Sequence, residues 1–114
     1  MNNKFGVPCS KFPKELLKDV NIYCTNEAEA MALAVGVILA GKEPEVYIQN
    51  SGLGHCVDII TSLYKPYRIQ LPKLHLSLRK QPTHHKYMGK ITIPLIKLLK
   101  YPIKKITFYN DKDN

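Results

Sequence analysis

Residues 20–49 read VNIYCTNEAEAMALAVGVILAGKEPEVYIQ, and this stretch decides the fold class. Val20–Thr25 is rich in β-forming residues and predicts a strand. Thr25 or Asn26 then caps a helix over Glu27–Ala40, with acidic residues in its first turn and Gly41 just after its end. A second strand follows at Glu45–Gln49. Strand, helix and strand joined by short loops form a βαβ unit, whose two strands run parallel in one sheet.

The same alternation continues on both sides of this unit. We expect further strands at Phe5–Pro8, Lys73–Leu78 and Ile106–Tyr109, and helices at Pro13–Lys18, Cys56–Tyr64 and Ile93–Leu99. Between the fourth strand and the last helix, Arg79–Met88 is predicted to be irregular and polar. The sequence therefore predicts an α/β fold, a three-layer α/β/α arrangement around a mostly parallel sheet of about six strands.

Bulk composition restricts the class of protein. The chain has 114 residues, 45% of them hydrophobic and 23% charged, which is enough for one compact domain and too few for two. Its longest apolar stretch, Ala28–Ala40, is too short to span a bilayer, and no signal peptide is recognisable at the start. The three cysteines, an odd number without a CxxC pair, argue against a disulfide framework or a zinc site. We expect a cytoplasmic protein in which Cys9 and Cys56 are packing residues.

The net charge of +8 leaves several interpretations open. Lysines are dispersed along the chain, so a solvated basic face is the simplest reading. Attraction of an acidic substrate or partner subunit is the second, and a nucleic-acid-binding domain is the third. No RNP-like motif, helix-turn-helix pattern or zinc finger accompanies the charge, so we expect no nucleic-acid partner.

Three predicted strands end in residues that suit ligand binding. Gly6–Ser10 follows the first strand, Thr25–Glu27 the second, and Gln49–Gly54 the third. Ligands of open α/β sheets collect at these carboxyl ends, so a carboxylate, a hydroxyl and a glycine loop should share one rim. SGLG lacks the third glycine of a dinucleotide fingerprint and the Lys-Ser/Thr of a phosphate-binding loop. On these residues alone, a ligand-binding loop and a simple turn are both open.

Several motifs together resemble one enzyme family. TNEAEAMALAVG (25–36) followed by LAGK (39–42), QNSGLG (49–54) and GVPCS (6–10) are similar to segments of the pyrimidine-binding (PYR) domain of sulfopyruvate and phosphonopyruvate decarboxylases. Ser77–Arg79 and the stretch from His85 to Thr92 resemble two further family segments. The five motifs occur in family order and cover most of the chain. Residues 1–114 are thus expected to be a single PYR-type domain with ends that look trimmed.

The resemblance implies a thiamine-diphosphate-dependent carboxy-lyase. In this family the PYR domain receives the aminopyrimidine ring, while a PP domain of another chain or segment binds the diphosphate through Mg²⁺. Glu27 is then the catalytic and cofactor-binding carboxylate, which hydrogen-bonds N1′ and favours the imino tautomer that activates C2. Asn50, Ser51, Gly52, Leu53 and Gly54 are implied cofactor-binding residues. No metal ligand is expected in the chain itself.

The resemblance also implies a substrate and a partner. A small 2-oxoacid, 3-sulfopyruvate or 3-phosphonopyruvate, is expected to contact Ser10, Arg79 and His85, because a guanidinium suits a tetrahedral oxyanion. The chain carries no GDG…N magnesium-diphosphate motif, so a PP-domain (beta) subunit or a missing C-terminal segment is expected, in a dimer or hetero-oligomer.

This sequence departs from the family pattern at three positions. Cys9 stands where an aspartate is usual, Ala28 replaces a glycine, and His55 replaces an asparagine. These departures leave open an alternative class of function, a non-catalytic PYR-like module that pairs with a partner subunit.

Overall fold

The chain folds around one fully parallel sheet. The computed structural model describes residues 3–7, 12–81 and 83–110. Within them, five strands lie in the order β2-β1-β3-β4-β5, and every neighbouring pair is parallel. The strands are β1 (Lys4–Val7), β2 (Ile22–Tyr23), β3 (Glu45–Gln49), β4 (Lys73–Leu78) and β5 (Ile106–Asn110). The predicted α/β class and parallel sheet are confirmed, with five described strands in place of about six.

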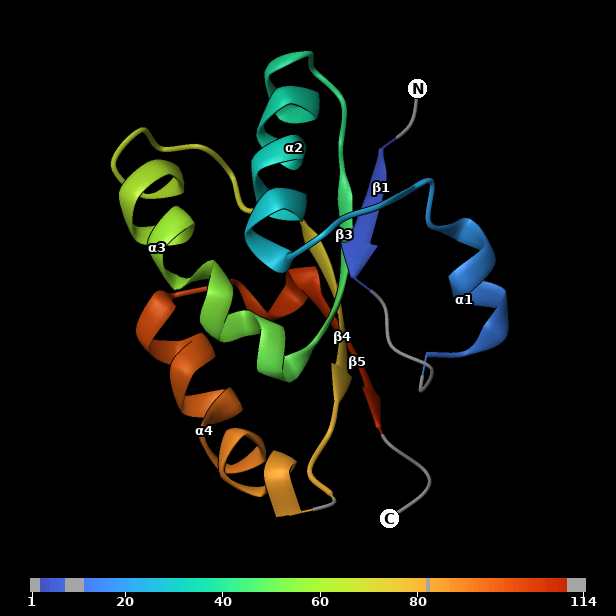
Figure 1. Ribbon diagram of the computed structural model, residues 1–114. Helices are drawn as coiled ribbons and strands as arrows, with labels where there is room; N and C mark the ends of the chain where they lie inside the picture. Colours follow the sequence, from blue (N-terminus) through green and yellow to red (C-terminus); the bar gives the residue numbers. More distant parts are fainter. Residues whose placement is uncertain (1–2, 8–11, 82, 111–114) are drawn as a thin grey trace.

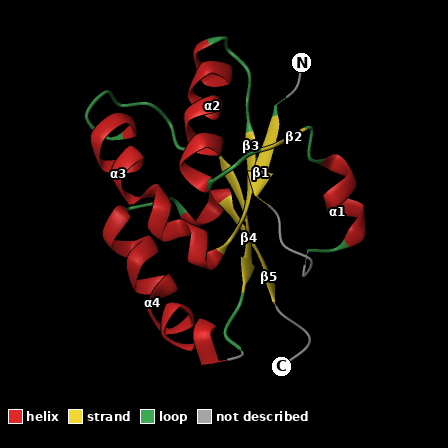
Figure 2. Cartoon of the chain, viewed as in Figure 1, coloured by secondary structure: helices red, strands yellow, loops and turns green. Residues whose placement is uncertain are grey.

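Helices cover both faces of the sheet, as the predicted three-layer arrangement requires. α1 (Lys14–Asp19) lies on one face, and α2 (Glu27–Leu39), α3 (Val57–Ile59) and α4 (Thr83–Leu99) lie on the other (Figure 1). α3 is the middle of a longer helical stretch that starts as a 3₁₀ segment at Asn50–Cys56 and ends as a π turn at Ile60–Tyr64. Figure 2 shows the strands as a layer between the two groups of helices.

The prediction for the segment after β4 was wrong. Residues expected to be irregular up to Met88 are helical from Thr83, so α4 begins ten residues before the predicted helix at Ile93. Pro94 sits inside this helix and removes one backbone donor from it. The first turns of α4 carry mostly exposed polar side chains, which is why they have no apolar periodicity in the sequence.

The main core lies between the sheet and the α2–α4 layer. Side chains of alternate residues on the strands point into it, including Phe5, Val46, Ile48, Leu74 and Leu76, all buried. Burial of such side chains contributes about 1.5–3 kcal/mol each to folding. α2 supplies Ala30, Met31, Ala34 and Val37 to the same core.

The opposite face of the sheet carries a close approach between β1 and β3. A Cβ atom at Gly6 would lie 2.8 Å from the Cβ of Tyr47 and 3.2 Å from its carbonyl carbon. Glycine is therefore required at this position, because the obstacle is partly backbone and cannot move aside. The aromatic ring of Tyr47 packs on this face, stacked on His75 with a centroid distance of 4.1 Å.

Candidate functional site

The candidate site lies where the strand order reverses. β1 is flanked by β2 on one side and β3 on the other, so successive connections leave the sheet in opposite directions at this point. In open parallel sheets of this strand order, ligands bind outside the carboxyl ends of the strands at the reversal. The start of α2 and the segment that follows β3 both lie at that edge (Figure 1).

Glu27 and Gly52 are in direct contact across this edge. A Cβ atom at Gly52 would lie 2.5 Å from Cδ and 2.6 Å from Oε2 of Glu27, so the carboxylate rests on the bare main chain of the loop. Gly52 is buried and Glu27 is half-buried. Two residues that the sequence predicted for one site, 25 positions apart, thus form one surface. Within the described residues, the Glu27 carboxylate has no hydrogen-bond or ion-pair partner.

Glu29, two residues after Glu27, has a different role. Asn26 caps α2 by accepting a hydrogen bond from the backbone N–H of Glu29 at 3.0 Å. The Glu29 carboxylate in turn accepts hydrogen bonds from the backbone N–H of Thr25 at 2.7 Å and from its hydroxyl at 3.2 Å. This reciprocal arrangement resembles a capping box and stabilises the helix start. Glu29 is therefore committed to structure, whereas Glu27 in the same turn is available for a ligand.

Cys56 stabilises the loop by a hydrogen bond to Gly52. Its thiol donates a hydrogen bond to the Gly52 carbonyl at 3.5 Å, and its side chain is buried. Burial, with a smaller contribution from the nearby Glu27 charge, raises the pKa of Cys56 to about 12. The thiol therefore stays protonated at neutral pH, which agrees with the predicted packing role.

The other residues of the glycine loop face different surroundings. Leu53 is buried and packs in the main core, so its side chain anchors the loop. Ser51 is exposed, and its hydroxyl accepts a hydrogen bond from the Gln49 side chain at 2.7 Å. Gly54 is exposed, with open space where a Cβ atom would be.

Asn50 and Arg79 are brought together at the ends of β3 and β4. The fully buried Asn50 amide accepts a hydrogen bond from the Arg79 backbone N–H at 2.9 Å and donates one to its carbonyl at 3.1 Å. The half-buried guanidinium of Arg79 donates to Gln49 Oε1 at 3.5 Å. His85 is buried in the first turn of α4, with its ring 4.1 Å from that of His84. Ser10 and Cys9 lie outside the described residues.

A second polar cluster, on the α1 face of the sheet, was not predicted from the sequence. Glu45 Oε1 lies 2.6 Å from His75 Nε2, and His75 Nδ1 lies 2.8 Å from the Tyr109 hydroxyl. A carboxylate can only accept, so Nε2 carries the proton and Nδ1 accepts from Tyr109. Burial lowers the pKa of His75 despite the opposing effect of Glu45. The alternation of polar and apolar residues in β4 was the signal available for this cluster.

Charges around this cluster also affect Glu45. Burial would raise the pKa of Glu45, but the hydrogen bond and charge of His75, with Lys4 and Lys73, lower it below its ordinary value. At neutral pH the pair is therefore a neutral imidazole that donates to an ionised carboxylate.

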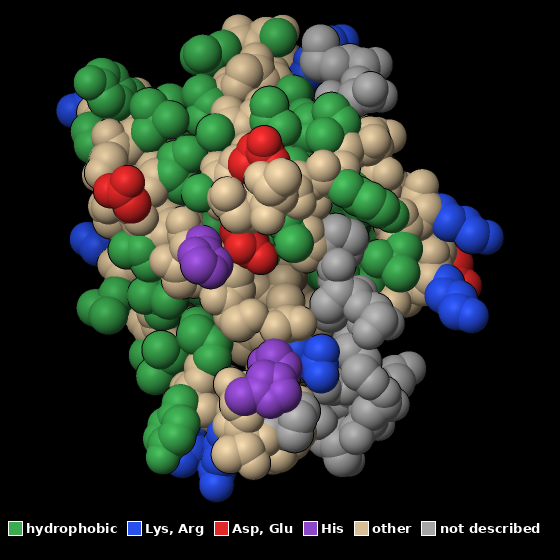
Figure 3. Space-filling model, in the orientation of Figure 1, with side chains coloured by type: hydrophobic (Ala, Val, Ile, Leu, Met, Phe, Trp, Pro, Cys, Tyr) green, Lys and Arg blue, Asp and Glu red, His purple; other side chains and the backbone are tan. Residues whose placement is uncertain are grey.

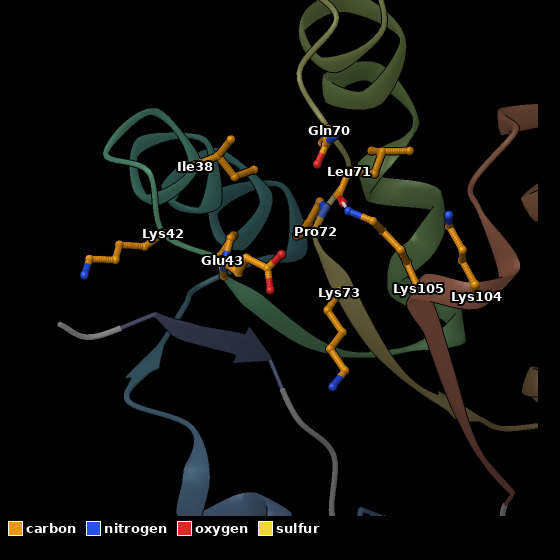
Figure 4. Close-up of a pocket in the computed structure, with 10 residues that line it drawn as sticks. Ile38, Lys42, Glu43, Gln70, Leu71, Pro72, Lys73, Lys104 and Lys105 are labelled. Carbon is orange, nitrogen blue, oxygen red and sulfur yellow. Dashed lines mark hydrogen bonds between the residues drawn. The ribbon is translucent and has the colours of Figure 1, made fainter.

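A hollow of about 220 Å³ lies at the opposite edge of the sheet, where the chain enters β3, β4 and β5. It is lined by apolar residues, by Glu43 and Gln70, and by four lysines, Lys42, Lys73, Lys104 and Lys105. Lys105 donates a hydrogen bond to the Leu71 carbonyl at 2.8 Å, while Lys42 and Lys73 point away from that contact (Figure 4). None of the predicted site residues lines this hollow.

Comparison with known proteins adds the decisive observation. The chain is 41% identical, over 71 residues, to the sulfopyruvate decarboxylase subunit alpha of Methanocaldococcus jannaschii; the match covers 56% of this chain and 41% of that one. It is 34% identical over 106 residues to the phosphonopyruvate decarboxylase of Streptomyces viridochromogenes, covering 82% of this chain and 26% of that one. The chain is a relative of the sulfopyruvate and phosphonopyruvate decarboxylases. The predicted resemblance to this decarboxylase family is confirmed.

The match to these decarboxylases is partial in length. A second alpha subunit, from Methanothermobacter thermautotrophicus, is 29% identical over 91 residues, which are 75% of this chain and 53% of that subunit. The chain thus spans about half the length, or less, of the curated decarboxylases it matches. No protein-family model matches it.

Two general features of this decarboxylase relative complete the description. In the described ranges, none of the helices has both the length and the apolar character needed to cross a bilayer. Nor do three or more His, Cys, Asp or Glu side chains of that part of the chain come together as a metal site.

Proposed function

We propose that this chain is the PYR-domain part, or alpha subunit, of a thiamine-diphosphate-dependent 2-oxoacid decarboxylase acting on 3-sulfopyruvate or 3-phosphonopyruvate. The observation that carries the proposal is the Glu27 carboxylate, which rests on Gly52 at the strand reversal without a partner among the described residues. Residues 1–114 form one PYR-type domain in this reading, and the protein acts in the cytoplasm.

The residues at this edge fit the pyrimidine end of the cofactor. A half-buried carboxylate that packs against the buried main chain of Gly52 offers an acceptor for a ring N–H. When bound, thiamine diphosphate supplies the nucleophilic carbon and the electron sink that decarboxylation requires. Glu27 would accept a hydrogen bond from the protonated N1′, and Asn50, Ser51, Gly52, Leu53 and Gly54 would form the loop beside the ring.

Arg79 is the proposed contact for the acidic group of the substrate. Its main chain is fixed by Asn50, and its guanidinium lies beside Gln49 at the same carboxyl edge. A planar guanidinium binds sulfonate and phosphonate oxygens in pairs. His85 and Ser10 remain proposed substrate contacts on the strength of the resemblance.

The surface of the chain supports a partner subunit. α2 carries no charged residue after Glu29, and it exposes 41% of Leu33 and 75% of Leu39. α4 exposes 52% of Ile91 and 81% of Leu98, and Figure 3 shows hydrophobic side chains spread over the α2–α4 side of the molecule. Apolar surface of this kind is typical of protein interfaces. We propose a PP-domain partner that binds the diphosphate through Mg²⁺, in a dimer or hetero-oligomer.

Affinity capture followed by an activity assay tests the proposal. The tagged chain is captured from its native lysate, supplied with thiamine diphosphate and Mg²⁺, and assayed for CO₂ release from each acid. We expect one acid to be decarboxylated, with a loss of about 10²–10⁴-fold in Glu27→Gln, since general acid–base groups contribute that much. Glu29→Gln is the matched control and should retain activity, because its amide oxygen can still cap the helix.

Two outcomes would contradict the proposal. If the captured material decarboxylates neither acid, the chain is better described as a non-catalytic PYR-like module. If activity is present but Glu27→Gln leaves it unchanged, the carboxylate is not the cofactor contact.

A further inference from the structure

Asn50 has every polar atom of its side chain satisfied in a fully buried contact. Its Nδ2 donates to the Arg79 carbonyl at 3.1 Å and to Thr92 Oγ1 at 2.9 Å, and its Oδ1 accepts from the Arg79 N–H at 2.9 Å. The side chain is 0% exposed. Three elements therefore meet at one amide: the segment after β3, the end of β4, and α4.

The two hydrogen bonds from the Asn50 side chain to the Arg79 main chain continue the pairing of β3 and β4 beyond the last residues of the strands. The ladder between β3 and β4 has its last pair at Gln49 and Ser77. Beyond it, the Asn50 amide offers one acceptor and one donor to the Arg79 main chain, as a neighbouring strand would. Only a primary amide has both groups at this reach, since a carboxylate lacks the donor. The main-chain position of Arg79 thus depends on how the Asn50 amide is oriented.

Thr92 stabilises that orientation from α4. Its hydroxyl donates to the Met88 carbonyl, one helical turn earlier, at 2.6 Å. With its proton committed there, Thr92 Oγ1 can only accept from Asn50, so it favours the same amide orientation that the Arg79 main chain requires, with Nδ2 toward α4 and Oδ1 toward the Arg79 N–H. Thr92 is 1% exposed, and water cannot replace it.

α4 also contacts the segment after β4 about one turn earlier, at Gly89. A Cβ atom at Gly89 would lie 3.0–3.2 Å from the Lys80 side chain and its Cα. The segment after β4 is therefore packed against α4 at Gly89 and hydrogen-bonded to it, through Asn50, at Thr92.

We propose that Thr92 is a positioning residue of the candidate site. Acting through Asn50, its hydroxyl fixes the main chain of Arg79 and the loop that starts at Ser51 and carries Gly52 beneath Glu27. This inference rests on the proposed function for the roles of Arg79 and Glu27. The hold of Thr92 on the Arg79 main chain is independent of it.

The test compares three variants of the full chain. Thr92→Val removes the hydroxyl with little change of shape, and Thr92→Ser keeps the hydroxyl but loses the methyl group. Thr61→Val is the matched control, because the Thr61 hydroxyl also donates to a carbonyl one turn earlier, at Val57 (2.9 Å), but the residue is exposed and its hydroxyl bonds within its own helical stretch.

Amide hydrogen exchange by NMR gives the first measurement. The exchange rate of the Arg79 amide is compared with that of Leu76, a core amide that reports on global unfolding. We expect Thr92→Val to raise the Arg79 rate relative to Leu76 by about tenfold or more, as the loss of a buried hydrogen-bond partner implies. Thr92→Ser and Thr61→Val should stay within about threefold of the parent chain.

Kinetics of the complex give the second measurement. With a partner bound, Thr92→Val should lower kcat/KM for the preferred acid by about tenfold or more, mainly through KM, because Arg79 is misplaced. Thr92→Ser should restore it. Unchanged Arg79 exchange in Thr92→Val, or equal impairment of Thr92→Ser, would overturn the proposal. If the parent complex decarboxylates nothing, the proposed function fails, and the exchange experiment still decides whether Thr92 holds Arg79.

Discussion

A single added methyl group at Gly52 should impair the candidate site and leave the fold intact. In Gly52→Ala the new Cβ atom meets the Glu27 side chain, with Cδ at 2.5 Å and Oε2 at 2.6 Å in the present geometry. The atoms that must move belong to a flexible, half-buried side chain and not to the backbone of a neighbouring strand. The carboxylate therefore swings aside while the loop keeps its path.

The size of the effect follows from the distances. To reach the 3.4 Å of an ordinary contact, the Glu27 carboxyl carbon must retreat by about 0.9 Å, and Cγ, the atom nearest to the new methyl group, by slightly more. A displacement of about 1 Å in a catalytic group costs about 10²-fold in rate. Stability should change by no more than about 1 kcal/mol, because a strained rotamer of Glu27 is offset by the lower chain entropy of alanine in the unfolded state.

The assay is CO₂ release by the captured complex, with thermal denaturation of each variant beside it. Gly36→Ala is the matched control, since the same substitution in α2, outside the proposed site, meets open space. We expect Gly36→Ala to retain activity and Gly52→Ala to lose about 10²-fold at nearly unchanged stability. Equal activity of the two variants, with Glu27→Gln inactive, would refute the inference that the carboxylate must rest on the Gly52 main chain.

Three further predictions concern stability. Asn26→Ala should lower the free energy of unfolding by about 1 kcal/mol, measured by urea denaturation, through loss of the α2 cap. Gly6→Ala should prevent stable folding or cost several times more than Gly36→Ala, because the added group meets the main chain of β3 in the first case and open space in the second; circular dichroism melts compare them. His75 binds its proton less readily when folded, so stability should fall as pH drops below its ordinary pKa of 6.5, by at most about 1.4 kcal/mol per pH unit. His75→Gln should flatten the curve between pH 5 and 7, and an unchanged slope in this variant would contradict the assignment.

The sequence was sufficient for the parts of the fold that depend on local patterns. The βαβ unit of residues 20–49 has β-branched strands, a capped helix start at Asn26 and a helix stop at Gly41, whose φ of +81° suits glycine. The sequence also predicted that Glu27 and Gly52 lie at the same edge, because the carboxyl ends of parallel strands share one edge of the sheet. Neither inference required a contact between distant side chains.

The start of α4 could not be predicted, for an identifiable reason. From Thr83 to Tyr87 only His85 is buried, so the helix has almost no apolar face where it begins. The other buried residues of α4 lie further along the helix, at Thr92, Ile96 and Leu99. These three positions have the spacing of one helical face, and Thr92 is the polar residue on it. That anomaly was the available signal for its contact with Asn50, 42 residues away.

Glu27 and Glu29 illustrate why the candidate site is better explained by function than by stability. Both lie in the first turn of α2, where a negative charge is favourable. Glu29 already completes the cap with Thr25, so Glu27 is not needed to start the helix. It nevertheless occupies a half-buried position over Gly52, where within the described residues no donor compensates its lost hydration. A donor from outside the chain would supply that compensation, and a ring N–H held by a partner subunit across the apolar face of α2 is the donor that the proposed function provides.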